Sequence, residues 1–225
     1  MKSELSNPQT LNDRMAELIR QKIVHGEFTP GQRLSEAALS ESLEISRNTL
    51  REVFRLLTKE GLLKHEPNRG VFVAIPSIAS IIDIYRVRRL IECQALAQAY
   101  PRHPAKKHLR DAVEMALRCR DAGDWQGVGT ANMEFHMAIV ELADSERLNV
   151  VFSHLLAELR LAFGLLNDPE FLHMPYVEMN VNILELFEAG KLQEAAAALN
   201  EYLVHSERIV LAVYARRISD SGTPK

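Results

Sequence analysis

The sequence predicts a mainly α protein, with an N-terminal winged helix-turn-helix that carries a small β-hairpin and a C-terminal antiparallel six-helix bundle. Three observations predict this fold. Apolar residues recur with helical spacing between residues 10 and 61, two short β-prone runs follow around a turn, and every long segment after residue 78 again has helical period. The expected domains are residues 1–75 and 81–225, joined by a linker at 76–80 that begins with Pro76.

The first two helices are expected at residues 10–25 and 34–43. Gly26 can end the first helix, and a tight turn at residues 44–45 follows the second. Two short helices joined to a third by a turn of this length are typical of a helix-turn-helix.

The third helix is the one that predicts a function. Ser46 is a good N-cap and Gly61 a good C-terminal stop. One face of the helix is apolar, with Leu50, Val53, Phe54 and Leu57, and the opposite face carries Arg47, Arg51 and Arg55, with Asn48 in the first turn. Arginine can bind guanine and asparagine can bind adenine in the major groove, so the pattern favours a DNA-recognition helix. The alternative is an amphipathic helix whose charges only face solvent.

A basic hairpin follows this helix. Residues 62–66 and 71–74 are β-prone, and the turn Pro67-Asn68-Arg69-Gly70 joins them. From residue 46 to 69 there are six basic and three acidic side chains, a local net charge of +3. Because the whole chain has a net charge of −3, the rest of the chain carries −6. A basic patch on an acidic protein would orient the molecule on phosphate.

The C-terminal part is expected to contain only helices. Breaks such as Gly123-Asp124 and Gly190 separate six segments with short connections, which are typical of an antiparallel bundle. The expected helices are 78–100, 105–122, 125–144, 146–166, 174–189 and 191–217.

The bulk composition indicates a cytoplasmic protein. The 225 residues contain no apolar run long enough for a membrane span, and the first ten residues lack the apolar core of a signal peptide. Cys93 and Cys119 have no metal-like spacing, and two cysteines do not make a disulfide framework.

A dense and correctly ordered set of residues up to Val73 matches a known pattern: Ile19-Arg20, Ile23 to Gly26, Pro30-Gly31, Leu34-Ser35-Glu36, Leu39, Ser46-Arg47, Leu50-Arg51-Glu52, Leu57, Glu60-Gly61-Leu62 and Arg69 to Val73. In these residues the chain resembles the GntR family of bacterial transcription regulators. The helical remainder resembles the FadR-type subgroup, whose ligand-binding FCD domain follows the winged helix. The residues that support this are Arg88 to Glu92, Phe135-His136 and the turn at Ala189-Gly190-Lys191.

The resemblance implies a homodimer that binds a roughly palindromic double-stranded operator. It assigns base contacts to Arg47, Asn48 and Arg51, phosphate contacts to Ser46 and Thr49, and a minor-groove contact to the wing tip at Arg69 and Gly70; Arg33 is also expected to bind DNA. Some members carry an extra arginine in the second helix, where this sequence has Ala37 or Ala38, so contacts from that helix are not expected.

The resemblance also locates a ligand site in the bundle. Many FadR-type bundles hold a divalent metal with an Asp and a His four residues apart and two further His residues, where this chain has Asn132, His136, Asn180 and Tyr202. Only His136 remains of these ligands, and one imidazole, two amides and a phenol make a poor cation site, so no metal cofactor is expected. A metal-dependent sensor that uses His136 with non-standard ligands, His205 among the candidates, is the alternative.

The same polar residues lie within apolar helix stripes, and Arg88 does as well. Because buried polar groups need partners, we expect Arg88, Asn132, His136, Asn180 and Tyr202 to bind a small acidic effector. The alternatives are a core network whose members satisfy one another, and an Arg88 that pairs with Glu92. His136 has no accompanying nucleophile, cofactor motif or carboxylate pair, so an enzyme is not expected. The sequence therefore predicts a DNA-binding repressor that responds to a small molecule.

Overall fold

The computed structural model describes residues 10–100, 102–165 and 168–221. Within these residues the chain forms nine helices and one small antiparallel sheet, so the predicted fold class is confirmed. The N-terminal elements are α1 (Leu11–Val24), β1 (Arg33–Leu34), α2 (Glu36–Ser42), α3 (Arg47–Lys59), β2 (Leu63–Glu66) and β3 (Gly70–Val73). The later helices are α4 (Ile78–Gln98), α5 (Lys106–Asp121), α6 (Trp125–Glu141), α7 (Glu146–Phe163), α8 (Pro169–Glu188) and α9 (Leu192–Ser221).

Side-chain caps begin the three N-terminal helices. Thr10 forms a capping box with Asp13 at the start of α1, and Ser35 and Ser46 accept backbone hydrogen bonds at the starts of α2 and α3. Gly61 follows α3 with a φ of 77°, a left-handed conformation that glycine adopts without strain. These local signals explain why the N-terminal helices lie close to their expected positions.

The wing differs from the expected hairpin by one strand. Strands β2 and β3 pair as predicted, but Arg33–Leu34 adds a third strand on the other side of β3, which gives the order β1-β3-β2. A two-residue strand is too short to show alternation, so the sequence pattern could not indicate it.

The bundle helices lie near their expected positions, with one exception. Helix α8 begins at Pro169 and not at residue 174. Pro169 occupies the first turn, where a missing N–H costs nothing, and the Asp168 side chain accepts a hydrogen bond from the Phe171 N–H at 2.9 Å. The expected break was Asn167-Asp168-Pro169, of which Asn167 lies outside the described residues, as does residue 166, the expected end of the preceding helix.

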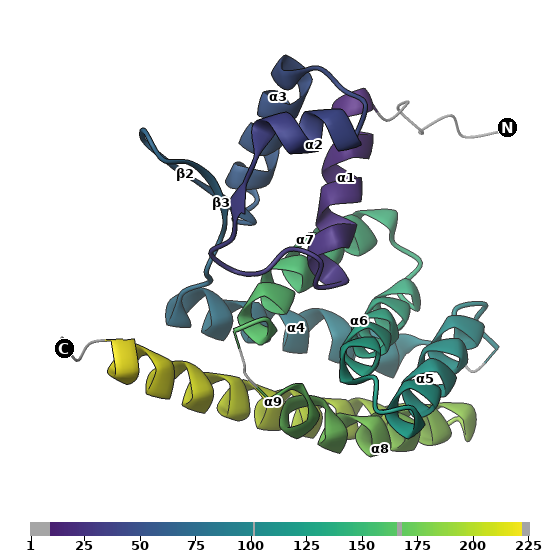
Figure 1. Ribbon diagram of the computed structural model, residues 1–225. Helices are drawn as coiled ribbons and strands as arrows, with labels where there is room; N and C mark the ends of the chain where they lie inside the picture. Colours follow the sequence, from purple (N-terminus) through teal and green to yellow (C-terminus); the bar gives the residue numbers. More distant parts are fainter. Residues whose placement is uncertain (1–9, 101, 166–167, 222–225) are drawn as a thin grey trace, which may run out of the picture.

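Helix α7 belongs to the cores of both parts of the molecule. Its Ala157 and Leu161 are buried among the apolar side chains of α1, α3 and the sheet, while Phe152 and Leu159 are buried in the bundle core. Figure 1 shows α7 between the N-terminal helices and the rest of the bundle. The winged helix is therefore packed directly onto the bundle.

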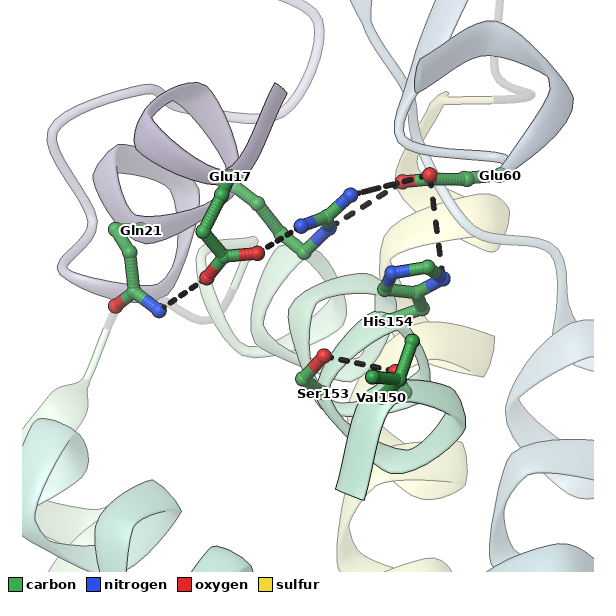
Figure 2. Close-up of polar contacts among 7 residues, drawn as sticks. Glu17, Gln21, Glu60, Val150, Ser153 and His154 are labelled. Carbon is green, nitrogen blue, oxygen red and sulfur yellow. Dashed lines mark hydrogen bonds and ion pairs between the residues drawn. The ribbon is translucent and has the colours of Figure 1, made fainter. Parts of the chain in front are cut away.

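Polar contacts join the same two parts. Arg20 of α1 is buried and its Nη2 lies 2.9 Å from Glu60 Oε2, and its Nη1 also pairs with Glu17. His154 of α7 faces Glu60 from the other side, with its Nδ1 3.9 Å from Oε1 (Figure 2). Gln126 Nε2 at the start of α6 donates to the His25 carbonyl at 2.7 Å. These contacts fix how α1 sits on the bundle.

No helix in the described part of the chain is long and apolar enough to cross a membrane.

Candidate DNA-binding surface and effector site

The first turn of α3 presents several hydrogen-bond donors. Ser46 Oγ accepts from the Thr49 N–H at 3.1 Å, and the two hydroxyls lie 2.9 Å apart. Arg47 and Asn48 are exposed beside them, and the turn contains no acidic residue. The N-terminus of a helix carries a partial positive charge, so this end is suited to phosphate.

The arginine row of α3 faces solvent because the opposite face is fully used in packing. Leu50, Val53, Phe54 and Leu57 are all buried in the core of the winged helix. Arg51 is exposed, and its Nε donates to Glu36 Oε2 of α2 at 3.0 Å. Glu36 was not among the predicted site residues. Its position in the first turn of the preceding helix is the signal that could have suggested it, because that helix crosses α3 in a helix-turn-helix.

The wing brings the remaining predicted DNA contacts together. Asn68 has a φ of 61° and Gly70 a φ of 106°, which turn the chain sharply between β2 and β3. Arg69 is exposed, pairs with Glu66 and places its guanidinium carbon 5.3 Å from the centre of the Phe72 ring. Arg33 lies over Gly70, where a Cβ would be 3.5 Å from Arg33 Nε, because β1 pairs with β3.

A second group of predicted residues meets inside the bundle. Arg88 Nε of α4 donates to Glu92 Oε1 at 2.7 Å, and Glu92 Oε2 lies 2.6 Å from His136 Nδ1 of α6. All three side chains are buried. The pairing of Arg88 with Glu92 that the sequence left open is thus present, and Glu92 also holds His136.

The other three predicted residues form an adjoining set of hydrogen bonds. Asn132 Oδ1 of α6 accepts from Asn180 Nδ2 of α8 at 2.8 Å and from the Tyr202 hydroxyl of α9 at 2.9 Å. The Tyr202 and His136 rings are 4.9 Å apart between centres. Four helices therefore bring the five predicted effector residues into one cluster.

Electrostatics in this cluster favour an ionised Glu92 and a neutral His136. Burial tends to raise the pKa of Glu92, but Arg88 and His136 together lower it below its ordinary value. Burial lowers the pKa of His136 more than Glu92 raises it. An ionised carboxylate only accepts, so the His136 Nδ1–H donates to it and Nε2 carries a lone pair.

Three buried polar atoms of the cluster have no hydrogen-bond partner within the described chain: Arg88 Nη2, His136 Nε2 and Asn180 Oδ1. They amount to one donor and two acceptors, provided that the Asn180 amide is oriented by its bond to Asn132. A small molecule with an acceptor oxygen and a hydroxyl or amino group would match them, whereas a network that satisfied itself would leave none.

The donor set does not fit the divalent metal that many FadR-type bundles hold. The positions carry Asn132, His136, Asn180 and Tyr202, so an imidazole is accompanied by amides and a phenol, which are weak ligands for zinc-like ions. Over residues 10–100, 102–165 and 168–221, no three His, Cys, Asp or Glu side chains are grouped to hold a metal ion.

Two family models match the chain. The model described as bacterial regulatory proteins, gntR family, matches residues 11–73, and the FCD domain matches residues 83–205. The crystal structure of a protein from Rhodococcus sp. RHA1, described as a transcriptional regulator GntR, is 35% identical, with a TM-score of 0.83. That match covers 89% of this chain and 97% of the Rhodococcus chain.

Curated relatives match over shorter segments. The Nta operon transcriptional regulator of Aminobacter aminovorans is 29% identical over 54% of this chain and 58% of its own length. The HTH-type transcriptional repressor RspR of Escherichia coli is 32% identical over 44% of this chain and 43% of its own. The chain thus spans about half the length of these curated relatives. The two family models and the Rhodococcus structure together show that the chain belongs to the GntR family of DNA-binding transcription regulators, in the FadR-type subgroup with an FCD domain.

Proposed function

We propose that the protein is a homodimeric repressor that acts in the cytoplasm on a roughly palindromic operator, and that a small acidic metabolite modulates its operator binding. The observation that carries the DNA part is the N-terminal end of α3, where Arg47, Asn48 and Arg51 are exposed near two hydroxyls and the helix N-terminus. In this proposal the three side chains contact bases, Ser46 and Thr49 contact phosphate, and the wing enters the minor groove.

Arg33, Arg69 and Gly70 carry the wing contact in the proposal. The closeness of Arg33 to Gly70 supports it, because both arginines then reach the same stretch of backbone or minor groove. The Arg69 side of its ion pair with Glu66 is exposed, so the guanidinium can exchange the glutamate for phosphate at low cost.

The effector is proposed to bind at Arg88, Asn132, His136, Asn180 and Tyr202. The three unpaired atoms support this, because a carboxylate or carbonyl oxygen can accept from Arg88 Nη2 while a hydroxyl donates to His136 Nε2 or Asn180 Oδ1. A small acid that also carries a hydroxyl or amino group has both features.

Helix α7 is the proposed route between the two sites. It contributes Leu161 to the core of the winged helix and Phe152 to the core of the bundle, so a shift of the bundle helices moves α1 and α3 with it. In a dimer such a shift changes the separation of the two recognition helices, which must match half-sites about one helical turn apart. The effector would thus select between two domain arrangements.

The test begins with DNA sequences that the purified protein selects from a random duplex library. An inverted repeat is expected among the selected sequences. Arg51→Ala should weaken binding to this repeat, and the effector should change the affinity of the wild type for it. A selected site without two-fold symmetry, or sedimentation as a monomer at binding concentrations, would contradict the homodimer.

The effector is tested with a series of 2-hydroxy acids and the matching acids without the hydroxyl. The hydroxy acids should raise the melting temperature of the wild type and have a smaller effect on Tyr202→Phe, which loses one hydrogen bond of the cluster. If acids with and without the hydroxyl stabilise both proteins equally, this site assignment is wrong.

A metal-dependent sensor is the second candidate, because His136 Nε2 is a buried imidazole nitrogen with a free lone pair. Elemental analysis of the protein as purified, before and after dialysis against a chelator, separates the two proposals. One equivalent of a transition metal that is lost in His136→Gln would favour the metal-dependent sensor.

A further inference from the structure

Arg160 of α7 is a buried cation without a counter-ion in the described chain. The described residues contain three buried arginines, and two of them, Arg20 and Arg88, pair with glutamates. Only 7% of Arg160 is exposed, and no acceptor in that part of the chain contacts its guanidinium. A buried charge without a partner opposes folding, so such a residue is rarely kept for stability alone.

The backbone around Arg160 makes room for its side chain. A Cβ on Gly129 of α6 would lie 2.3 Å from Arg160 Nη1 and 2.7 Å from His173 Nε2, so the guanidinium and the imidazole converge where this glycine has no side chain. A Cβ on Gly26, which ends α1, would lie 3.6 Å from Arg160 Nη2. Elements of both domains therefore surround the cation.

Arg160 and His173 face a pocket of about 200 Å³ at the junction of the two domains. The winged helix contributes the turn from Gly26 to Pro30, and the bundle contributes the starts of α6 and α8 together with the end of α7. The walls include Phe28, Trp125 and Phe163, and none of the lining residues is acidic. This volume is below the roughly 300 Å³ of sites for drug-sized ligands, so any occupant is small.

The electrostatics of the pocket are those of an anion site. Burial lowers the pKa of Arg160 to about 10, so the guanidinium stays charged at neutral pH. Burial, with a contribution from Arg160, lowers the pKa of His173 to about 3, so its imidazole is neutral and can donate one hydrogen bond. The N-termini of α6 and α8 are already capped by Asp124 and Asp168, so Arg160 is the cation that an anion would meet in the pocket.

We propose that this junction pocket binds the carboxylate of a small organic acid, with Arg160 as its ion-pair partner, His173 as a hydrogen-bond donor and Phe28, Trp125 and Phe163 against its apolar part. A guanidinium matches a carboxylate in two parallel hydrogen bonds, and the apolar walls suit a short hydrocarbon body better than a strongly hydrated phosphate. Because the winged helix forms one wall, the bound acid stabilises the observed contact between α1 and the bundle.

The site is separate from the cluster around Arg88. Gly129 precedes Asn132 on α6 by less than one turn, and His173 precedes Asn180 on α8 by about two turns, so the pocket lies toward the N-terminal ends of both helices. The inference does not depend on the proposed effector site, and either can fail alone.

Trp125 makes the test specific, because it lines the pocket and is the only tryptophan in the sequence. The full-length protein is titrated with benzoate, with the neutral analogue benzamide and with inorganic phosphate, and Trp125 fluorescence is recorded. We expect a saturable change with benzoate, at least about tenfold weaker binding of benzamide, and a similar loss of benzoate affinity in Arg160→Gln. The matched control is Arg118→Gln, which removes an exposed arginine of α5 and should leave benzoate binding unchanged.

Several outcomes would overturn the proposal. Benzoate binding that is equal in the wild type and Arg160→Gln would place the acid elsewhere, and saturable binding of phosphate but not benzoate would refute the carboxylate assignment. The Tyr202→Phe variant should bind benzoate like the wild type, and a loss of the Trp125 signal there would show that the two sites are one.

Melting temperatures measured without ligand show whether the variants fold. Because the Arg160 charge is uncompensated, Arg160→Met is expected to keep or raise the melting temperature, whereas Arg88→Met, which leaves the buried Glu92 without its counter-ion, lowers it. A large drop in the melting temperature of Arg160→Met would mean that the guanidinium already has a partner, which would contradict the proposal.

Discussion

The buried ion pair between Arg88 and Glu92 provides a quantitative test of the bundle core. Glu92→Gln keeps the size of the side chain but removes its charge, which leaves the fully buried Arg88 without a counter-ion. Removal of one partner from such a pair costs about 3–5 kcal/mol of unfolding free energy. Glu92 also accepts the His136 Nδ1–H at 2.6 Å, so we expect a value toward the upper end of this range.

A double-mutant cycle measures the interaction energy between Arg88 and Glu92 apart from the other effects of each substitution. Glu92→Gln, Arg88→Met and the double variant are unfolded with urea at one fixed protein concentration, because a dimer's stability depends on concentration. Each single variant leaves one uncompensated charge, whereas the double variant leaves none. The loss in the double variant should therefore be smaller than the sum of the single losses by about 2–3 kcal/mol.

The pH dependence of the unfolding free energy provides a second test of the same pair. The folded-state pKa of Glu92 lies below its ordinary value, so Glu92 contributes stability above its unfolded pKa and loses this contribution as the pH falls toward the folded one. This component of acid destabilisation should be absent in Glu92→Gln. Single losses below about 1 kcal/mol, or strictly additive losses, would refute the inference that this pair is buried and isolated from water.

Three further predictions concern other parts of the molecule. Arg51→Ala should weaken binding to the selected operator by about 1–3 kcal/mol in a fluorescence anisotropy titration, while Arg55→Ala, which removes a neighbouring exposed arginine, should have a smaller and sequence-independent effect. His173 has a folded pKa of about 3 against an ordinary value near 6.5, so the stability of the wild type should fall by up to about 1.4 kcal/mol per pH unit as the pH drops through that range, and a urea series on His173→Phe should lack this component. Leu161→Ala should cost about 2–5 kcal/mol in unfolding free energy and also weaken operator binding, and a variant that lost stability but bound DNA normally would contradict the role of α7 as the route between domains.

Local signals explain why the winged helix could be predicted closely. The stop at Gly61 and the serine caps at Ser35 and Ser46 are properties of neighbouring residues, and the apolar stripe of α3 recurs with helical period. The third strand was missed because Arg33–Leu34 is defined only by its pairing with β3. The start of α8 was missed because Pro175 lies inside the helix, where proline normally interrupts the hydrogen bonding.

Of the two candidate ligand sites, one could be predicted from the sequence and the other could not. The residues of the Arg88 cluster could be named because the family resemblance indicates four of the positions and all five are polar side chains on apolar stripes, and they do meet in the structure. Arg160 and His173 could not be named, since neither is at a position that the resemblance indicates and they come together only through the glycine at position 129. His173 in particular showed no spacing to other histidines that would suggest a site.

The contact between Arg51 and Glu36 has a consequence for selectivity among DNA sequences. In the proposed DNA complex the glutamate would compete with DNA for the guanidinium, and an exposed pair of this kind contributes at most about 1 kcal/mol. A DNA site that offers Arg51 only phosphate would gain little from breaking this pair, so at random sequence Arg51 can stay on Glu36 and add nothing to the binding. A correctly placed guanine contributes about 1–3 kcal/mol, which exceeds the loss of the pair. If α3 is the recognition helix, as proposed, an acidic residue beside it would thereby lower binding to random DNA more than binding to the operator.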